Sequence, residues 1–261
     1  MLIATLIQTD LYWQNTSANL AMLQQKIAPL KNKTQLIILP EMYNTGFTMK
    51  PELYAETTDG ITLKWMKKMA AHTSAIVCGS VAIKDEAGNY YNQLLWVTPS
   101  GKYEYYNKRH LFAYAKENEY YTAGKQQLYT NVNGITVNCQ VCYDLRFPIW
   151  ARQPLNTPPY CVLLYIANWP KARNAAWQAL LTARAIENQC YVIGVNRTGK
   201  DGNGVDHIGN SMVVNALGET LLNCGNKEGV HTISLDMQAL KNIRSTFPFL
   251  KDADAYTIVT L

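Results

Sequence analysis

A cysteine, a glutamate and a lysine each follow an apolar or aromatic run typical of a strand, and their side chains could together perform nucleophilic catalysis. Cys142 ends the run ITVNCQVC, Glu41 follows LIILP, and Lys108 follows KYEYYN. A thiolate is a strong nucleophile, a carboxylate can act as its general base, and an ammonium can stabilise an oxyanion. Because open α/β folds place ligand sites at the carboxyl ends of their strands, these three side chains could share one pocket. Position alone does not decide, since Glu41 could be an ordinary loop carboxylate and Lys108 a solvated lysine.

Cys142 stands at a position suited to a nucleophile. Alternation along residues 135–142 places Cys139 with the apolar side chains and Cys142 on the opposite face. The following residues, YDLRFPIW, are expected to begin a helix, whose free backbone N–H groups would favour a thiolate and a developing oxyanion. As alternatives, an isolated cysteine is often a small buried side chain, and Cys139 and Cys142 also spell CxxC. The redox or metal interpretation is weaker, because strand positions i and i+3 point to opposite faces and the sequence has no second CxxC or paired-histidine motif.

The elements that must position these residues alternate between strands and helices. A strand at 2–8, a helix with apolar positions from Leu20 to Leu30, and the strand-like run QLIILP form a βαβ unit. A helix at 62–71 then precedes antiparallel strands at 75–83, 90–97 and 102–106. Residues 107–125 lack clean periodicity, so we expect a long functional loop with a helical turn.

The second half of the chain repeats this alternation. Strands at 127–130 and 135–141 are expected to form a hairpin around Asn133-Gly134. The remaining predicted elements are a strand at 160–167, a helix at 174–188, a strand at 190–195, a loop with Gly199, Gly202 and Gly204, the hairpin SMVVNALGETLLN, a strand at 230–235 and a last helix capped by Asp236. This order predicts an α/β fold with mixed sheets covered by helices. The sequence has no linker-like segment or repeat, so we expect one domain over residues 1–261.

Bulk properties narrow the function classes. The chain of 261 residues has a net charge of +5 from 24 basic and 19 acidic residues, without a run of like charges, so we do not expect nucleic-acid binding. The apolar start MLIATLIQTD is too short and lacks the flanks of a signal peptide or membrane span, which predicts a soluble protein without a membrane partner. Several of the six cysteines lie in apolar runs such as SAIVCGSVAI, which favours free thiols and a cytoplasmic location.

Five ordered segments carry a family resemblance. The segments ILPEMYNTGF, NKRHLF and VCYDLRFP resemble, in order, the glutamate, lysine and cysteine motifs of the nitrilase superfamily of carbon–nitrogen hydrolases. ANWP with ARAIENQCYVIGVNRTG, and then GNSMVVNALGE, are similar to later motifs of that family, so the resemblance covers nearly the whole chain. Within the superfamily this wording is most similar to the ω-amidase-like branch. The resemblance implies a four-layer αββα sandwich, a reaction without cofactor or metal, and a homodimer in which the segment 247–261 reaches over the partner.

The resemblance also implies a mechanism and a substrate class. Cys142 would attack the carbon of a small-molecule amide while Glu41 takes the thiol proton, and Glu41 would then activate a water to hydrolyse the thioester. Lys108 and the backbone N–H of Tyr143 would stabilise the oxyanion in both steps. The implied substrates are dicarboxylate monoamides such as α-ketoglutaramate and succinamate.

Further site residues are expected from the resemblance and from chemistry. The family's second glutamate precedes a loop glycine by seven positions, which indicates Glu117, with Glu119 as the alternative. Arg173 is a candidate to bind the distal carboxylate, because guanidinium pairs with that group in a bidentate way; a solvated arginine is the alternative. Trp169 and Tyr43 are candidates to line the pocket, although large aromatic side chains often serve only packing.

Other interpretations of the same residues stay open. Asp144 and Arg146 are expected to fix the turn after Cys142. His110 offers a Cys-His pair, although a loop histidine is more often a structural hydrogen-bonding residue. The same triad could also perform nitrile hydrolysis, N-carbamoyl hydrolysis or acyl transfer, and the fold could serve a non-catalytic binding protein.

Overall fold

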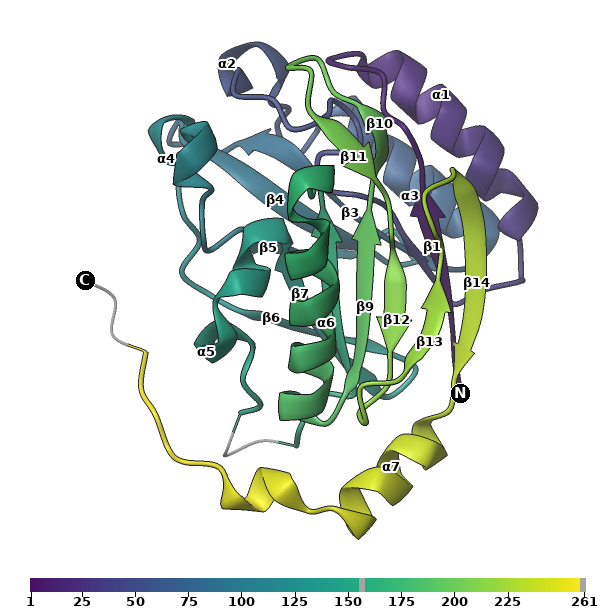
Figure 1. The fold of residues 1–261 in the computed structure, drawn as a ribbon. Coiled ribbons are helices and arrows are strands. Elements are labelled where there is room, and N and C mark those ends of the chain that lie inside the picture. The colour runs from purple at the N-terminus through teal and green to yellow at the C-terminus, as the bar shows by residue number, and fades with distance from the viewer. Residues whose placement is uncertain (155–157, 259–261) are drawn as a thin grey trace.

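Two six-stranded sheets form the centre of the protein in a computed structural model that describes residues 1–154 and 158–258 (Figure 1). The strand order is β14-β1-β2-β3-β4-β5 in the first sheet and β13-β12-β9-β8-β7-β6 in the second. In each sheet three neighbouring strands are parallel and the outer pairs are antiparallel. The prediction of mixed sheets is therefore confirmed.

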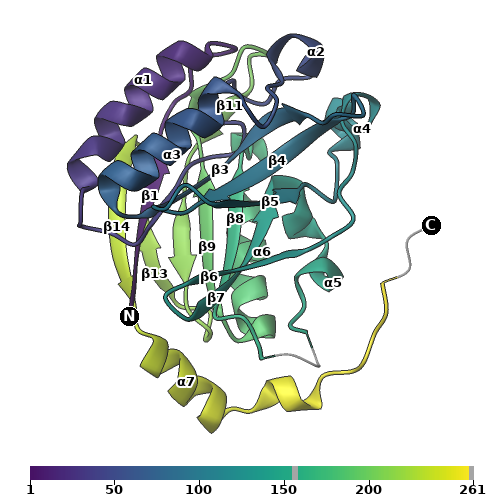
Figure 2. The ribbon, with the colours of Figure 1, turned by 180° about the vertical axis from the view of Figure 1, so that it is seen from behind.

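Helices α1 (Thr16–Ile27) and α3 (Ile61–Thr73) cover the outer face of the first sheet (Figure 2). Its strands are β1 (Leu2–Gln8), β2 (Leu36–Ile38), β3 (Ile76–Lys84), β4 (Tyr90–Val97), β5 (Tyr103–Asn107) and β14 (Gly229–Leu235). Apolar side chains of α1 at helical spacing, Leu20, Leu23 and Ile27, pack in one cluster with Ile37 of β2. This packing holds the end of β2 in place, and Glu41 follows shortly after that end.

Helix α6 (Asn174–Asn188) covers the outer face of the second sheet (Figure 1). The strands of this sheet are β6 (Leu128–Val132), β7 (Ile135–Val141), β8 (Val162–Ala167), β9 (Tyr191–Asn196), β12 (Met212–Val214) and β13 (Thr220–Asn223). Gly194 of β9 permits the close approach of the helix, since a Cβ there would lie 2.5 Å from Leu181 Cδ1. The bounds of α6 match the predicted helix at 174–188.

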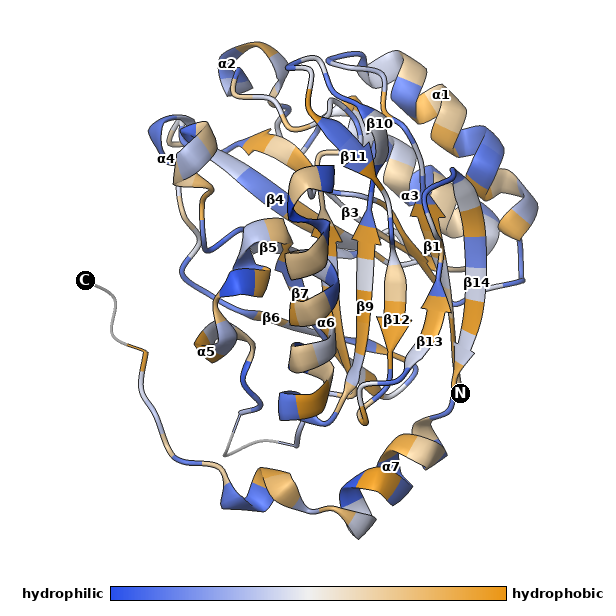
Figure 3. Cartoon of the chain, in the orientation of Figure 1, coloured by the Kyte–Doolittle hydropathy of each residue, from blue (hydrophilic) through white to orange (hydrophobic). Residues whose placement is uncertain are grey.

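The inner faces of the two sheets pack against each other and complete four layers in the order helix, sheet, sheet, helix. Leu6, Ile38 and Cys78 from the first sheet lie in one apolar cluster with Val137 and Cys139 from the second. Many residues of the central strands are hydrophobic and are drawn in orange in Figure 3. The αββα sandwich that the resemblance implies is therefore present.

The chain ends outside these layers. Asp236 caps helix α7 (Met237–Thr246), as predicted, by accepting from the backbone N–H groups of Gln238 and Ala239. The following segment runs along the edge of the molecule, and residues 259–261 of it lie outside the described residues. Across the described residues, no helix has both the length and the apolar character needed to span a membrane.

Two local expectations need correction, and one helix was not expected. The helix expected after Cys142 is instead a 3₁₀ helix, Cys142–Arg146, followed by the four-residue α5 (Pro148–Ala151). Pro148 is the reason, because a residue before proline avoids the helical region, and Phe147 has φ −112° and ψ 88°. The glycine-rich loop forms a hairpin of β10 (Thr198–Lys200) and β11 (Asp206–Ile208), and α2 (Pro51–Tyr54) was not expected.

Candidate active site

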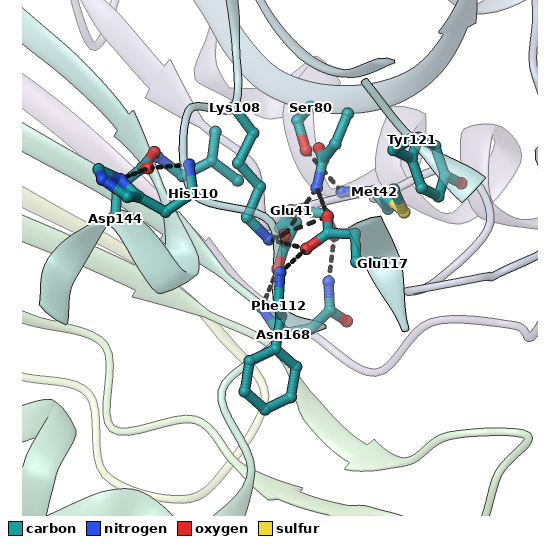
Figure 4. Close-up of polar contacts among 12 residues, drawn as sticks. Glu41, Met42, Ser80, Lys108, His110, Phe112, Glu117, Tyr121, Asp144 and Asn168 are labelled. Carbon is teal, nitrogen blue, oxygen red and sulfur yellow. Dashed lines mark hydrogen bonds and ion pairs between the residues drawn. The ribbon is translucent and has the colours of Figure 1, made fainter. Parts of the chain in front are cut away.

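Glu41 is fully buried between the carboxyl ends of strands from both sheets. Its Oε1 accepts a hydrogen bond from Lys108 Nζ at 2.9 Å, and its Oε2 accepts from the backbone N–H of Asn168 at 2.8 Å (Figure 4). Asn168 directly follows β8, so the glutamate of the first sheet is held by the second. A carboxylate fixed on both oxygens cannot rotate away from its neighbours.

Lys108 forms a buried ion cluster with two carboxylates. The residue follows β5, and its Nζ lies 2.9 Å from Glu41 Oε1 and 2.8 Å from Glu117 Oε2. Burial on its own would lower the pKa of Lys108, but the charges of Glu117 and Glu41 outweigh it and raise the pKa. Lys108 is therefore a fixed cation throughout the neutral range.

Glu117 lies on the short helix α4 (Glu117–Tyr120), within the loop that was expected to be functional. Burial raises its pKa, Lys108 opposes this effect, and the charge of Glu41 adds to it. The backbone N–H of Phe112 donates to Glu117 Oε2 at 2.6 Å. Glu119, the alternative, is exposed and pairs loosely with Lys116 at 3.8 Å, so the structure places Glu117 and not Glu119 in the cluster.

Cys142 stands at a strained turn between β7 and the 3₁₀ helix. Its φ of +48° is uncommon for a residue other than glycine and points to a conformation that the surroundings impose. Burial raises the pKa of the Cys142 thiol, the charge of Glu41 raises it further, and Lys108 lowers it. The expectation that this position favours a resting thiolate is therefore not met, and a base must remove the proton during attack.

Asp144 holds this turn in place. Its Oδ2 accepts from the backbone N–H of Val141 at 3.0 Å and from the hydroxyl of Tyr106 at 2.8 Å. Its Oδ1 accepts from the backbone N–H of His110 at 2.9 Å and lies 2.8 Å from His110 Nδ1. The His110 ring also stacks on Phe147, with ring centroids 3.8 Å apart. His110 thus belongs to the support of the turn and does not line the cavity at Cys142.

A cavity of about 390 Å³ opens at Cys142. Its apolar walls include Phe47, Met49 and Phe112, and Tyr143 lines it beside the cysteine. A volume of this order suits a small ligand of a few carbon atoms. Among the described residues, no group of three or more histidine, cysteine or acidic side chains could hold a metal ion.

Two guanidinium groups border this cavity. The Cζ of Arg173 lies 5.1 Å from the ring centroid of Phe112, and that of Arg146 lies 5.1 Å from the ring of Trp169. Within the part of the chain that the structure describes, neither arginine has a carboxylate within ion-pair distance. Asp201 also lines the cavity, so two guanidinium groups stand against one carboxylate, and the excess of positive charge favours an anionic ligand.

Tyr43 does not line this cavity. It is fully buried in the core beneath α3, with its ring centroid 6.0 Å from that of Trp65 and its ring against Gly79. Tyr43 is therefore a packing residue, whereas Trp169 lines the cavity and donates its indole N–H to the backbone oxygen of Arg173 at 2.8 Å. Arg146, expected only to fix the turn, faces the cavity as well.

Two features of the site were not found from the sequence. Asn92 of β4 donates to both Glu41 and Glu117, at 2.8 and 3.1 Å. His207 of β11 lines the cavity, and burial followed by the charge of Arg197 lowers its pKa to about 4. A polar residue inside the apolar strand run YYNQLLWV was the available signal for Asn92; the glycine-rich segment gave none for His207.

Comparisons with known proteins identify the family of the chain and its fold. A family model described as carbon–nitrogen hydrolase matches residues 3–245. Omega-amidase YafV of Escherichia coli K12 is 40% identical over 97% of both chains, and 2-oxoglutaramate amidase of Bacillus subtilis is 32% identical over 94% of this chain and 95% of that one. The crystal structure of XC1258 from Xanthomonas campestris, a CN-hydrolase superfamily protein with an arsenic adduct in its active site, has a TM-score of 0.96 and 38% identity and covers 99% of each chain.

Proposed function

The chain belongs to the carbon–nitrogen hydrolase family, in its ω-amidase-like branch, and we propose that it hydrolyses the terminal amide of a small dicarboxylate monoamide such as α-ketoglutaramate or succinamate. The main support is one arrangement: Cys142 lies beside the buried cluster of Glu41 and Lys108, in a cavity that also presents Arg146 and Arg173, which have no ion-pair partner among the described residues. Two relatives named as an omega-amidase and a 2-oxoglutaramate amidase support the same substrate class.

The proposed reaction has two halves. Glu41 takes the thiol proton while the Cys142 sulfur bonds to the amide carbon, and Glu41 then gives the proton to the leaving nitrogen, so that ammonia departs and a thioester remains. Glu41 next removes a proton from water, whose oxygen bonds to the thioester carbon; the carbon–sulfur bond breaks, and the sulfur regains a proton. Lys108 and the backbone N–H of Tyr143 stabilise the oxyanion in both halves.

In this proposal Arg173 makes the site prefer a substrate that carries a carboxylate. Its guanidinium borders the cavity without an acidic partner among the described residues, and a carboxylate is the group that it pairs with best. Trp169 positions this arginine, since its indole N–H donates to the Arg173 backbone oxygen. The amide end of the substrate then faces Cys142 while its carboxylate meets Arg173.

Ammonia release from a panel of amides, nitriles and N-carbamoyl compounds tests the proposal. We expect turnover of α-ketoglutaramate and succinamate and none by Cys142→Ala protein that retains its unfolding temperature. Arg173→Met should lower kcat/KM for succinamate by roughly ten- to a hundredfold, the value of a hydrogen bond to a charged group, and should leave an uncharged amide such as butyramide unaffected. Lys171→Met, in the same 3₁₀ turn but exposed and outside the cavity, is the matched control.

The panel also separates the alternatives. Preferred turnover of a nitrile or an N-carbamoyl compound would assign a different reaction to the same three residues. A folded wild-type protein that releases ammonia from no compound, and whose Cys142 does not react with iodoacetamide, would indicate a binding protein instead.

We further propose that the protein acts as a homodimer through its C-terminal segment. Phe249 is 64% exposed, and Tyr256 and Ile258 are each 39% exposed, although all three are large and hydrophobic. Light scattering should give a dimer for the full chain and a smaller species after truncation behind Thr246. A monomeric full chain at micromolar concentration would contradict the proposal.

A further inference from the structure

Asn92 lies fully buried in β4 and bridges the two carboxylates of the site. Its Nδ2 donates to Glu41 Oε1 at 2.8 Å and to Glu117 Oε1 at 3.1 Å, so both amide hydrogens are used on acidic partners. Its backbone oxygen accepts from the N–H of Lys108 at 2.9 Å, which ties the same strand residue to the cation. One residue therefore touches all three charged members of the cluster.

The orientation of this amide is fixed by its partners. Asn92 Oδ1 is buried without a partner among the described residues, so the donor end alone holds the side chain. The reverse orientation would bring the carbonyl oxygen against Glu41 and Glu117, an acceptor against two acceptors. The two acceptors that Asn92 faces therefore require the donor end of its amide.

The cluster carries more negative than positive charge, and an uncharged donor can stabilise the excess without neutralising it. Glu41, Glu117 and Lys108 are all fully buried, which places two carboxylates around one ammonium. The two negative charges repel, and each charge that leaves water loses solvation, so one of the carboxylates would tend to take a proton. Of the described residues, Asn92 alone offers an uncharged side-chain donor to both carboxylates.

Asn92 also selects the oxygen that can act as base. Glu41 Oε1 accepts from Lys108 and Asn92, which uses both of its lone pairs, whereas the one donor to Oε2 among the described residues is the backbone N–H of Asn168. Oε2 therefore retains a lone pair for the thiol proton of Cys142.

We propose that Asn92 is a positioning residue that keeps Glu41 and Glu117 ionised together and thereby sets the lowest pH at which Glu41 can accept the thiol proton of Cys142. This inference rests on the proposed function for the role of Glu41. Its consequence is a shift along the pH axis, whereas a merely structural role would lower activity equally at all pH values.

The test measures two pH profiles of the same proteins, kcat/KM for succinamate and the rate of Cys142 alkylation by iodoacetamide. In Asn92→Leu we expect the acidic limb of both profiles to move up by about one to two pH units, because two hydrogen bonds to charged groups are lost. At high pH the activity should return towards that of the wild type. Asn92→Ser, which keeps one donor, should shift the limb by less and serves if Asn92→Leu does not fold.

Gln93→Leu is the matched control. Gln93 is the next residue of the strand, is 5% exposed, and donates to Asn107 Oδ1 at 2.8 Å instead of to the cluster. The acidic limbs of both pH profiles of the Gln93→Leu protein should lie at the same pH as in the wild type. If a folded Asn92 variant shows both acidic limbs at the same pH as the wild type, the inference is overturned. If the Asn92 variants shift the acidic limb of the alkylation profile but the wild type hydrolyses no amide, the proposed function is overturned and the role of Asn92 stands.

Discussion

Replacing Lys108 by methionine tests the buried ion cluster. The change keeps an unbranched side chain of similar size but removes the ammonium that lies 2.9 Å from Glu41 and 2.8 Å from Glu117. Two carboxylates would then remain buried without a cation. Removal of one partner from a buried ion pair costs about 3–5 kcal/mol, because the remaining charge has neither water nor partner.

This loss should be visible in thermal unfolding. For a chain of this size, 1 kcal/mol corresponds to about 2–4 °C, so the unfolding temperature should fall by roughly 6–20 °C. Lys26→Met is the matched control, because Lys26 forms an ion pair of similar length, 3.0 Å to Glu228, with side chains that are 24% and 48% exposed. A surface pair contributes about 0–1 kcal/mol, so the control should change by less than about 4 °C.

The pH dependence of the Lys108→Met protein gives a second check. Without the cation, the pKa values of the two buried carboxyl groups lie above their values in the unfolded chain, so the folded state binds more protons than the unfolded state in mildly acidic solution. Stability is then greatest at low pH and falls as the pH rises through the raised pKa. The deficit relative to wild type should therefore be larger at pH 8 than at pH 5.5. An unfolding temperature within 4 °C of wild type at pH 8, or a deficit that does not change with pH, would refute the reasoning.

Three further variants test the surroundings of this cluster. Asp144→Asn should lower both kcat and the unfolding temperature, because it replaces the carboxylate that accepts four hydrogen bonds at the turn. An unchanged kcat would contradict the role of Asp144 in holding the turn at Cys142. Burial lowers the pKa of His207 to about 4. As the pH falls from 6.5 to 4, the unfolded state binds more protons, so the wild type should lose about 1 kcal/mol of stability per pH unit, while His207→Gln should show a flatter profile in urea unfolding. Glu117→Gln should lower kcat at least about tenfold, whereas the exposed Glu119→Gln should match wild type, and equal effects would contradict the assignment.

Periodicity and turn residues predicted most of the secondary structure. The two-residue turn at Asn133-Gly134 and the helical spacing along 174–188 are local signals, and both elements have the expected position. The hairpin of β10 and β11 has strands of three residues each, too short for a period to appear among glycines. The helix expected after Cys142 is shorter in the structure, because Pro148 keeps Phe147 out of the helical conformation.

The family resemblance singled out Glu41, Lys108 and Cys142, and the structure brings their side chains together, while their catalytic roles stay predictions. The sequence could not show whether Tyr43 lines the cavity or packs in the core, because an aromatic residue near a strand end can point into either layer. In the structure Tyr43 packs beneath α3. Asn92 was missed since its strand is paired with β3 and β5 and its partners lie 51 and 25 residues away. Contacts between residues far apart in the chain are the information that a single sequence lacks.

Rapid acid quenching during turnover of succinamate, followed by mass spectrometry of the digested protein, tests most directly whether Cys142 carries the acyl group. We predict the mass of the succinyl group on the peptide that contains Cys142, present while ammonia is released and gone once the substrate is exhausted. The acyl mass on another residue, or an unmodified Cys142 at every quench time while ammonia is released, would contradict the account.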